Sequence, residues 1–376
     1  MAGAWRAALD LAGGVLRFSI EVEGATGAAT GRLCNGADCQ PFSAVEVKGD
    51  TVVFEMGDYA ASIRAIRRDD SLVGAYSNVG NRGPRTIPFR ASRGEWPAAP
   101  AGARLLGTWD AWFGAADRRS PRVLELRNQP EGVIGTVLSN SGDYGTFWGA
   151  GSGTEFSIGH FDGSFVYLIT ATLVGDSLRG VFHAGLRSQT PFVAGRSRGG
   201  PHLKPPTEVT TADTTAPFAF AFPNLDGTIV TNRDPRFEGK VVMVDIFGTW
   251  CPNCQDAAPT LLELYRTYHD RGFEVVSLAY EVTGDPAVDG ELVRRFRDKH
   301  GIPWPMLLAG MNDTELTAAT LPQLEGFTAY PTLLFLDRTG RVRKVHAGFY
   351  GPSTGAQFTK LKADLHSYVV ELLDER

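Results

Sequence analysis

The motif Trp250-Cys251-Pro252-Asn253-Cys254 holds two thiols separated by two residues. A continuous apolar strand is predicted to end just before this motif, and a helix is predicted to begin at it. The free backbone N–H groups and the positive dipole at a helix start stabilise a thiolate, which lowers the pKa of the first cysteine and makes it a nucleophile. The second sulfur then lies within reach of a mixed disulfide. This placement predicts a dithiol that exchanges with disulfides.

A second cysteine pair, Cys34 and Cys39, flanks an Asn-Gly turn over residues 35–38. A turn between two cysteines indicates a structural disulfide that closes a loop, and a second redox centre exchanging with the first motif is the alternative. A zinc site of four thiolates is disfavoured, because the pairs lie far apart and do not repeat a zinc-knuckle spacing. The disulfide would indicate an oxidising compartment and hence a removed export signal.

Composition describes a globular protein of 376 residues with 43% apolar residues, enough for two or three domains. The net charge is −5 and the charges are interleaved, so nucleic acid and anionic membrane surfaces are not expected partners. No apolar run of about 18 residues occurs, and no signal peptide follows Met1, so membrane anchoring would need a removed signal or lipid anchor. The histidines lack a metal-ligand spacing, which predicts no metal site.

The first two hundred residues contain an internal repeat, with 5–94 matching 109–199 at a separation of roughly 104 residues. Each copy shows short runs of Val, Ile, Phe and Tyr between glycine turns, which predicts an all-β region. We expect two small barrels side by side, or one larger barrel or sandwich. The matching segments are Ser71-Leu72-Val73-Gly74 with Ser177-Leu178-Arg179-Gly180, Pro88-Phe89 with Pro191-Phe192, and Ser92-Arg93-Gly94 with Ser197-Arg198-Gly199.

The expected domains are two β-repeats over 1–100 and 101–199, which could form one domain, a linker over 200–215, and an α/β domain over 216–376. The last region alternates strands with helices. Strands are predicted over 15–22, 52–54, 60–66, 123–126, 154–158, 165–173, 240–247, 273–280, 332–337 and 341–347, and helices over 256–270, 286–300 and 357–373.

From residue 216 to the C-terminus the chain resembles the thioredoxin superfamily, and within it the TlpA/ResA-like extracytoplasmic reductases. The resemblance lies in the strand and motif of 239–251, in Pro259 five residues after the second cysteine, and in Ala329-Tyr-Pro-Thr332 ahead of an apolar strand. The lead-in over 218–237 looks like the N-terminal hairpin of TlpA-like proteins. The resemblance does not extend to the β-repeats.

The resemblance implies that Cys251 attacks and Cys254 resolves. It also implies a cis peptide bond before Pro331, which would pack beside the disulfide and present the Tyr330 backbone to an extended substrate. Trp250, Pro252, Asn253 and Tyr330 would then form the substrate-binding edge.

Two carboxylates lie in or at the end of apolar strands, Asp245 and Glu281. A buried carboxylate without a partner is costly, which makes Asp245 informative. The resemblance to thioredoxins implies that it relays the proton of the resolving cysteine, although many TlpA-like proteins have a neutral residue there. The alternative is an acid at the strand edge that reaches water. Glu281 is either an auxiliary acid near the cysteines or a solvated strand-end residue.

The function expected from the resemblance is reduction of disulfides in extracytoplasmic client proteins, with a periplasmic location, an upstream electron donor and no cofactor besides the redox-active disulfide. An oxidant or isomerase would share the cysteines and differ in redox potential. A thiol peroxidase is disfavoured, because the lead-in Phe247 to Trp250 lacks the peroxidatic pattern. The alternative from another functional class is a β domain that binds a client or a ligand, with the thioredoxin-like domain as an accessory.

Overall fold

The computed structural model describes residues 1–25, 27–80 and 83–375. The chain divides into two compact units. Unit 1 comprises Met1–Ser139 and Tyr144–Leu203, and unit 2 comprises Asn140–Asp143 and Lys204–Arg376. The N-terminal unit is all-β and the C-terminal unit is α/β, as the sequence predicts.

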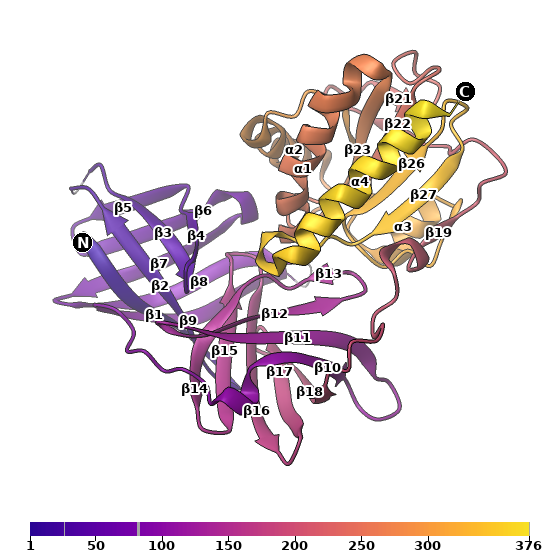
Figure 1. Cartoon of the computed structure of the whole chain (residues 1–376). Helices are drawn as coiled ribbons and strands as arrows, with labels where there is room; N and C mark the ends of the chain where they lie inside the picture. Colours follow the sequence, from indigo (N-terminus) through magenta and orange to yellow (C-terminus); the bar gives the residue numbers. More distant parts are fainter. Residues whose placement is uncertain (26, 81–82, 376) are drawn as a thin grey trace. The chain divides into compact units, whose positions relative to one another are not determined.

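The first sheet of unit 1 is antiparallel and runs in the order β4-β3-β2-β1-β9-β8-β7-β6-β5 (Figure 1). Alternating burial along β2 and β7 places apolar side chains on one face, as a period of two requires. The bounds are β1 (Gly3–Leu11), β2 (Gly14–Glu23), β3 (Thr30–Asn35), β4 (Asp38–Pro41), β5 (Ala44–Lys48), β6 (Thr51–Met56), β7 (Ala61–Arg68), β8 (Ser71–Gly80) and β9 (Gly83–Arg93).

The second sheet of unit 1 runs β11-β10-β18-β17-β16-β15-β14-β12, and β11 also pairs with β12. This pairing closes a barrel, whereas the first sheet forms a half-barrel. The bounds are β10 (Gly107–Phe113), β11 (Ser120–Gln129), β12 (Gly132–Ser139), β14 (Phe147–Ser152), β15 (Glu155–Phe161), β16 (Val166–Val174), β17 (Ser177–Ala184) and β18 (Ser188–Arg196).

The half-barrel completes its core with side chains from the closed barrel. Phe161 of β15 lies 5.0 Å from the ring of Phe18 on β2, and it belongs to the same buried cluster. The Asn35 amide donates to the Phe161 carbonyl at 2.9 Å and accepts from its N–H at 3.2 Å. The two repeats therefore form a half-barrel and a closed barrel that lie in one compact unit.

A tryptophan–arginine pair is repeated in the two sheets. Trp5 lies opposite Arg93, whose guanidinium stacks 4.7 Å from the indole, and Trp109 lies opposite Arg196 at 4.0 Å. Each indole N–H donates to the carbonyl four residues earlier. The counterpart of Arg93 is thus Arg196, so the sequence match with Arg198 is wrong by two residues. Strand register and ring stacking select the arginine, and a Ser-Arg-Gly tripeptide alone does not.

Unit 2 contains a five-stranded sheet in the order β24-β23-β22-β26-β27 (Figure 1). Strands β22, β23 and β24 are parallel, β26 is antiparallel to β22, and β27 is antiparallel to β26. Helix α1 packs against β23, α4 against β22 and β26, and α2 and α3 against β24. The bounds are β22 (Val241–Phe247), β23 (Phe273–Glu281), β24 (Met306–Met311), β26 (Thr332–Leu336), β27 (Val342–Ala347), α1 (Pro252–Tyr268), α2 (Pro286–His300), α3 (Thr314–Thr320) and α4 (Ala356–Asp374).

Short elements complete both units. In unit 2, β20 pairs with β21 and forms the predicted lead-in hairpin, and β19 pairs with β25. The low apolar content of 200–215 predicts a linker, whereas the structure places residues from Lys204 onward in unit 2 and pairs Thr211 with Glu325. Backbone pairing of this kind needs no apolar side chains. The bounds are β13 (Gly142–Asp143), β19 (Thr211–Ala212), β20 (Ala221–Pro223), β21 (Ile229–Thr231) and β25 (Leu324–Glu325), with 3-10 helices at Gly57–Tyr59, Ala103–Leu105, Pro206–Glu208, His269–Arg271 and Pro352–Thr354.

Helix α1 begins at Pro252, within the motif where a helix start is predicted and four residues before the helical range predicted from 256. Proline fits the first helical position because its missing N–H has no partner there. Helix α2 has the predicted bounds, since the Asp285 side chain caps its start and Gly301 ends it in a left-handed conformation. Over the described residues, none of the helices combines the length and the apolar character needed to cross a bilayer.

Candidate active site

The two thiols of the motif lie at the start of α1. Cys251 is the N-cap residue and Cys254 lies in the first turn, where its N–H donates to the Cys251 carbonyl at 3.0 Å. Both are free thiols with exposed fractions of 6% and 2%. Cys251 is therefore the cysteine at the helix N-terminus, and Cys254 is the more deeply buried one.

The loop before β26 contacts the first cysteine directly. The Tyr330–Pro331 peptide bond is cis, as the resemblance implies, and the Tyr330 carbonyl accepts from the Cys251 Sγ at 3.5 Å. The Gly348 N–H donates to the Pro331 carbonyl at 2.8 Å, which joins this loop to the residues after β27. The loop that carries Pro331 is thus held next to Cys251 by the Tyr330 carbonyl.

Asp245 is the buried carboxylate of this site, with an exposed fraction of 5%. The alternative of an acid at the strand edge that reaches water is therefore wrong. Its Oδ2 accepts a hydrogen bond from Ser277 Oγ at 2.9 Å, and burial raises the pKa of Asp245 to about 7 in spite of that bond. Burial also raises the pKa of Cys254, and the charges of Cys251 and Asp245 raise it further. Protonation of Asp245 and of Cys254 is consequently linked.

Glu281 ends β23 and is 1% exposed, so the expectation of a solvated strand-end residue is wrong. Its Oε1 accepts from the Thr249 N–H and its Oε2 from the Thr249 Oγ1, both at 2.8 Å. Burial raises the pKa of Glu281 to about 8. The carboxyl group therefore holds the turn between β22 and α1, two residues before Cys251.

Aromatic rings line the same turn. The Trp250 N–H donates to the Tyr280 carbonyl at 2.8 Å, and the Trp250 ring meets the Tyr330 ring edge-on at 5.4 Å. The Tyr330 hydroxyl lies 2.6 Å from Thr317 Oγ1 and is buried. Trp250 and Tyr330 are thus held together beside Cys251, in a position to shield the sulfur from water.

Asn253, predicted to bind substrate, directs its amide to two backbone carbonyls. Its Nδ2 donates to Phe349 O and to Asp143 O, both at 3.1 Å. The Asp143 carboxylate in turn accepts from Gly351 N at 2.6 Å and from Ser353 Oγ at 2.9 Å. Asp143 is buried and belongs to the short first segment of unit 2. Sequence analysis missed it, because no local pattern marks a residue 110 positions before Asn253.

The second cysteine pair forms a disulfide in unit 1. Cys34 and Cys39 lie opposite each other on β3 and β4, and residues 36 and 37 form the turn. Cys34 is buried. The disulfide therefore closes a hairpin, as predicted for a structural bond. The second repeat has no cysteine pair that corresponds to it.

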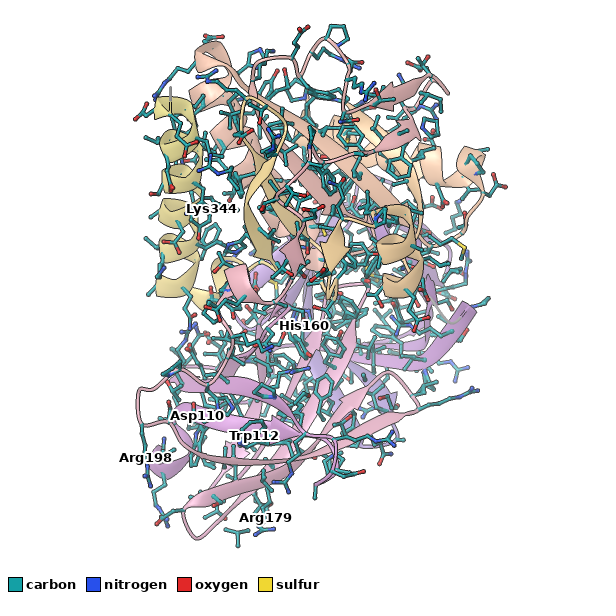
Figure 2. All side chains as sticks on the ribbon, turned by 90° about the vertical axis from the view of Figure 1, so that its right-hand side faces the viewer. Asp110, Trp112, His160, Arg179, Arg198 and Lys344 are labelled. Atoms are coloured by element: carbon teal, nitrogen blue, oxygen red, sulfur yellow. A yellow bond between two sulfur atoms is a disulfide. The ribbon has the colours of Figure 1, made fainter. Side chains whose placement is uncertain are left out.

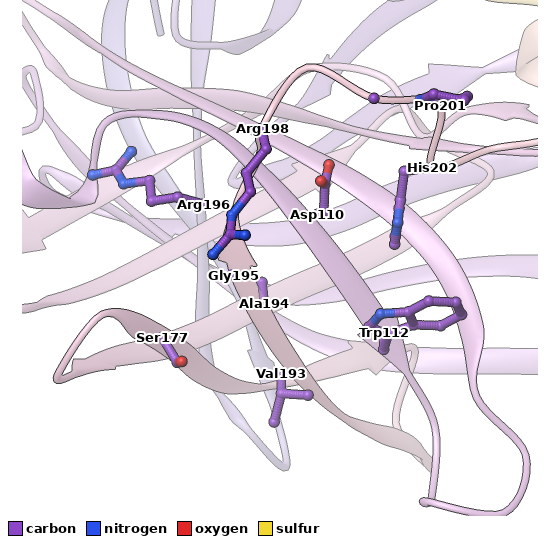
Figure 3. Close-up of a pocket in the computed structure, with 11 residues that line it drawn as sticks. Asp110, Trp112, Ser177, Val193, Ala194, Gly195, Arg196, Arg198, Pro201 and His202 are labelled. Atoms are coloured by element: carbon purple, nitrogen blue, oxygen red, sulfur yellow. The ribbon is translucent and has the colours of Figure 1, made fainter.

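A surface pocket of about 460 Å³ lies on unit 1 (Figure 3). Trp112 and His202 lie side by side at one end, with rings 4.9 Å apart, and the His202 Nε2 lies 2.9 Å from the Ala111 carbonyl. Arg196 stacks on Trp109, as described above. Across the described residues, three or more His, Cys, Asp or Glu side chains nowhere gather as a metal site would need. The free thiols of Cys251 and Cys254 lie in unit 2.

Comparison with known proteins finds matches to the part of the chain that contains these thiols. Residues 211–365 match the family model Redoxin. A thiol-disulfide oxidoreductase ResA from Halalkalibacterium halodurans is 28% identical over 130 residues, which cover 34% of this chain and 65% of the relative. ResA from Geobacillus thermodenitrificans is 29% identical over 129 residues, covering 34% and 66%. The chain thus spans slightly less than two thirds of the length of these curated relatives.

Among solved structures, a thiol:disulfide interchange protein of the thioredoxin family from Chlorobium tepidum is 26% identical, with a TM-score of 0.33. The match covers 43% of this chain and 99% of that one. By the family match and the curated relatives, residues 211–365 form a Redoxin domain, and the C-terminal part of the chain is similar to the ResA-like thiol–disulfide oxidoreductases.

Proposed function

We propose that this protein is a thiol–disulfide oxidoreductase that reduces disulfides in extracytoplasmic client proteins. One observation carries the proposal: two free thiols at the start of α1 lie beside the cis Tyr330–Pro331 bond, with the Tyr330 carbonyl 3.5 Å from Cys251 Sγ. A backbone carbonyl at this place can also pair with an extended client segment. The similarity to ResA proteins supports the same chemistry.

In the reaction, the Cys251 thiolate attacks one sulfur of the client disulfide. The client S–S bond breaks, a mixed disulfide forms, and the other client sulfur leaves and takes up a proton. Cys254 then transfers its proton to the Asp245 carboxylate and attacks Cys251 Sγ. The second client sulfur leaves as a thiolate and takes up a proton from water, so the client is released as a dithiol, and Cys251 and Cys254 remain as a disulfide. Two electrons have passed to the client, so an upstream electron donor must reduce the pair again.

The reducing direction is supported by the surroundings of Cys254. Burial and the charge of Asp245 raise the pKa of this thiol, so its thiolate is not stabilised. A dithiol centre is a stronger oxidant when its reduced form is stabilised, and the Cys254 thiol adds no thiolate stabilisation of that kind. An extracytoplasmic location is supported by the Cys34–Cys39 disulfide, because such bonds persist in oxidising compartments.

The reduction potential of Cys251 and Cys254 tests the direction. It is measured by titration in redox buffers with Cys34 and Cys39 replaced by serine, so that one centre titrates. We expect a value near or below about −230 mV. A value above about −150 mV would mark an oxidant or isomerase with the same cysteines, and would overturn the proposal.

A further inference from the structure

Asp245 is the last member of a buried hydrogen-bond chain that begins at an indole. The Trp304 Nε1 lies 2.9 Å from Ser277 Oγ, and Ser277 Oγ lies 2.9 Å from Asp245 Oδ2. All three side chains are buried. Ser277 is the neighbour of Asp245 across the parallel pair β22 and β23, so strand register brings the hydroxyl to the carboxyl group.

The direction of each hydrogen bond follows from the donor types. An indole N–H can only donate, so Ser277 Oγ accepts from Trp304. A hydroxyl has one hydrogen, and the hydrogen of Ser277 is therefore available for Asp245 Oδ2. Asp245 Oδ1 has no hydrogen-bond partner among the described residues. A proton taken up by this carboxyl group consequently goes to Oδ1.

The surroundings of Asp245 explain why this hydrogen-bond chain affects the pKa of the carboxyl group. On its other side Asp245 pairs with Leu333 of β26, whose side chain is apolar. The titratable group that faces it from α1 is Cys254, whose pKa Asp245 raises. Burial raises the pKa of Asp245, and the hydrogen bond from Ser277 is the contribution that opposes burial. Without that bond the pKa of the carboxyl group would be higher, so a smaller fraction of it would be ionised and able to accept a proton at neutral pH.

We propose that Ser277 and Trp304 are positioning residues, which fix Oδ1 of Asp245 as the oxygen that takes the proton of Cys254. This proposal rests on the proposed function. In the resolving step, the Cys254 S–H bond breaks and its proton moves to Oδ1, while Cys254 Sγ forms a bond to Cys251 Sγ. The bond from Cys251 to the client sulfur breaks at the same time, and its electron pair leaves with the client. When the donor reduces the pair again, the proton returns from Oδ1.

The titration of Asp245 tests the proposal without any client. The carboxyl signal is followed against pH by NMR in full-length oxidised protein with ¹³C-labelled aspartate, and Asp245→Asn assigns it. We expect Ser277→Ala to raise the midpoint by about one pH unit, the equivalent of one buried hydrogen bond. Trp304→Phe should raise it by less, because Ser277 keeps its hydroxyl but loses the donor that orients it. The double variant should equal Ser277→Ala, since Trp304 acts through Ser277.

Tyr268→Phe is the matched control, because it removes a hydrogen bond to His366 in the same unit, 2.9 Å long, away from Asp245. It should leave the midpoint unchanged. The proposal is overturned if Trp304→Phe lowers the melting temperature and leaves the midpoint in place, or if its shift persists in the Ser277→Ala background. Trp304→Phe alone carries the test if Ser277→Ala does not fold.

A separate assay distinguishes failure of the proposed function. Wild-type protein, reduced beforehand, is mixed with glutathione disulfide and the loss of thiols is followed. If the disulfide is not reduced while the Asp245 midpoint responds as expected, the function fails and the positioning role stands. If reduction proceeds while the midpoint does not respond, the positioning role fails alone. Reduction by Ser277→Ala should recover as the pH rises past its shifted midpoint.

Discussion

Thr249 donates two hydrogen bonds to one carboxyl group, from its N–H to Glu281 Oε1 and from its Oγ1 to Glu281 Oε2, each 2.8 Å long. The carboxyl group lies at the end of β23 and the threonine two residues before Cys251. These two hydrogen bonds hold the turn that carries Cys251 against the end of β23. Because Glu281 is buried, its protonation state affects both the stability of unit 2 and the geometry of the turn.

Glu281→Gln should flatten the pH dependence of unfolding. The pKa of Glu281 is raised from 4.5 to about 8 in the folded protein, so the folded state holds the proton more tightly than the unfolded state. This contribution to stability is complete below about pH 4.5 and is lost as the pH rises through about 8. The free energy of unfolding of reduced protein is measured with urea from about pH 5 to about pH 9. It should fall less steeply with rising pH in the variant than in the wild type.

Glu263→Gln is the control for that measurement. Lys362 lowers the pKa of Glu263, so the contribution of Glu263 to stability changes with pH in the opposite direction. It is lost as the pH falls. An unchanged slope in Glu281→Gln would contradict the assignment of Glu281 as a proton-holding group in the core.

Asp245→Asn should prolong the mixed disulfide between Cys251 and the client. Asparagine keeps the shape of the side chain and cannot accept the proton of Cys254. A general base contributes about a hundredfold or more, so the resolving step at neutral pH should slow by about that factor. Mass spectrometry of acid-quenched samples follows the adduct, and Cys254→Ser, which cannot resolve it, sets the upper limit. Equal adduct lifetimes in wild type and Asp245→Asn would remove Asp245 from the mechanism.

Asp143→Ala should destabilise unit 2 and loosen the residues beside the motif. The carboxylate accepts from Gly351 N and Ser353 Oγ, and it is 4% exposed. Removal of a buried charged acceptor leaves a donor unsatisfied and costs about 2 kcal/mol or more. Urea unfolding measures the loss, and amide exchange should rise at Gly351. Ser353→Ala removes one of the two bonds and should cost less. Equal stabilities of the three proteins would show that these bonds contribute nothing.

His160, which is labelled in Figure 2, lies in unit 1 and should lose its stabilising contact as the pH rises. Its Nδ1 lies 2.9 Å from the Thr146 carbonyl and its Nε2 lies 3.2 Å from Asp162 Oδ2, so both ring nitrogens face acceptors. Burial opposes the charged ring, but the hydrogen bond and charge of Asp162 outweigh it, and the pKa of His160 is raised above 6.5. The stabilisation is complete below about pH 6.5 and disappears as the pH rises through the raised pKa.

His160→Gln should therefore remove the loss of stability of unit 1 that sets in as the pH rises above about 6.5, as measured by thermal unfolding at a series of pH values. His183→Gln is the control, because burial lowers the pKa of His183 and its contribution changes at lower pH. A wild-type melting temperature that stays constant from pH 6 to about pH 9 would show that the His160 contact is not charged.

Some features of this protein follow from short stretches of sequence. The motif at 250–254 specifies a helix start with two thiols, because proline at the first helical position and the preceding apolar strand act locally. The bounds of α2 follow from Asp285 and Gly301, which cap its ends. The hairpin of Cys34 and Cys39 follows from a turn-forming tetrapeptide between them.

Other features depend on contacts between distant residues, and only the tertiary structure decides them. The burial of Glu281, the chain from Trp304 through Ser277 to Asp245, and the role of Asp143 arise from strand register and packing. The sequence by itself determined which groups could exchange electrons. The tertiary structure decided which carboxyl groups lie away from water and which partners orient them, because desolvation and hydrogen bonding depend on neighbours that the folded backbone brings together.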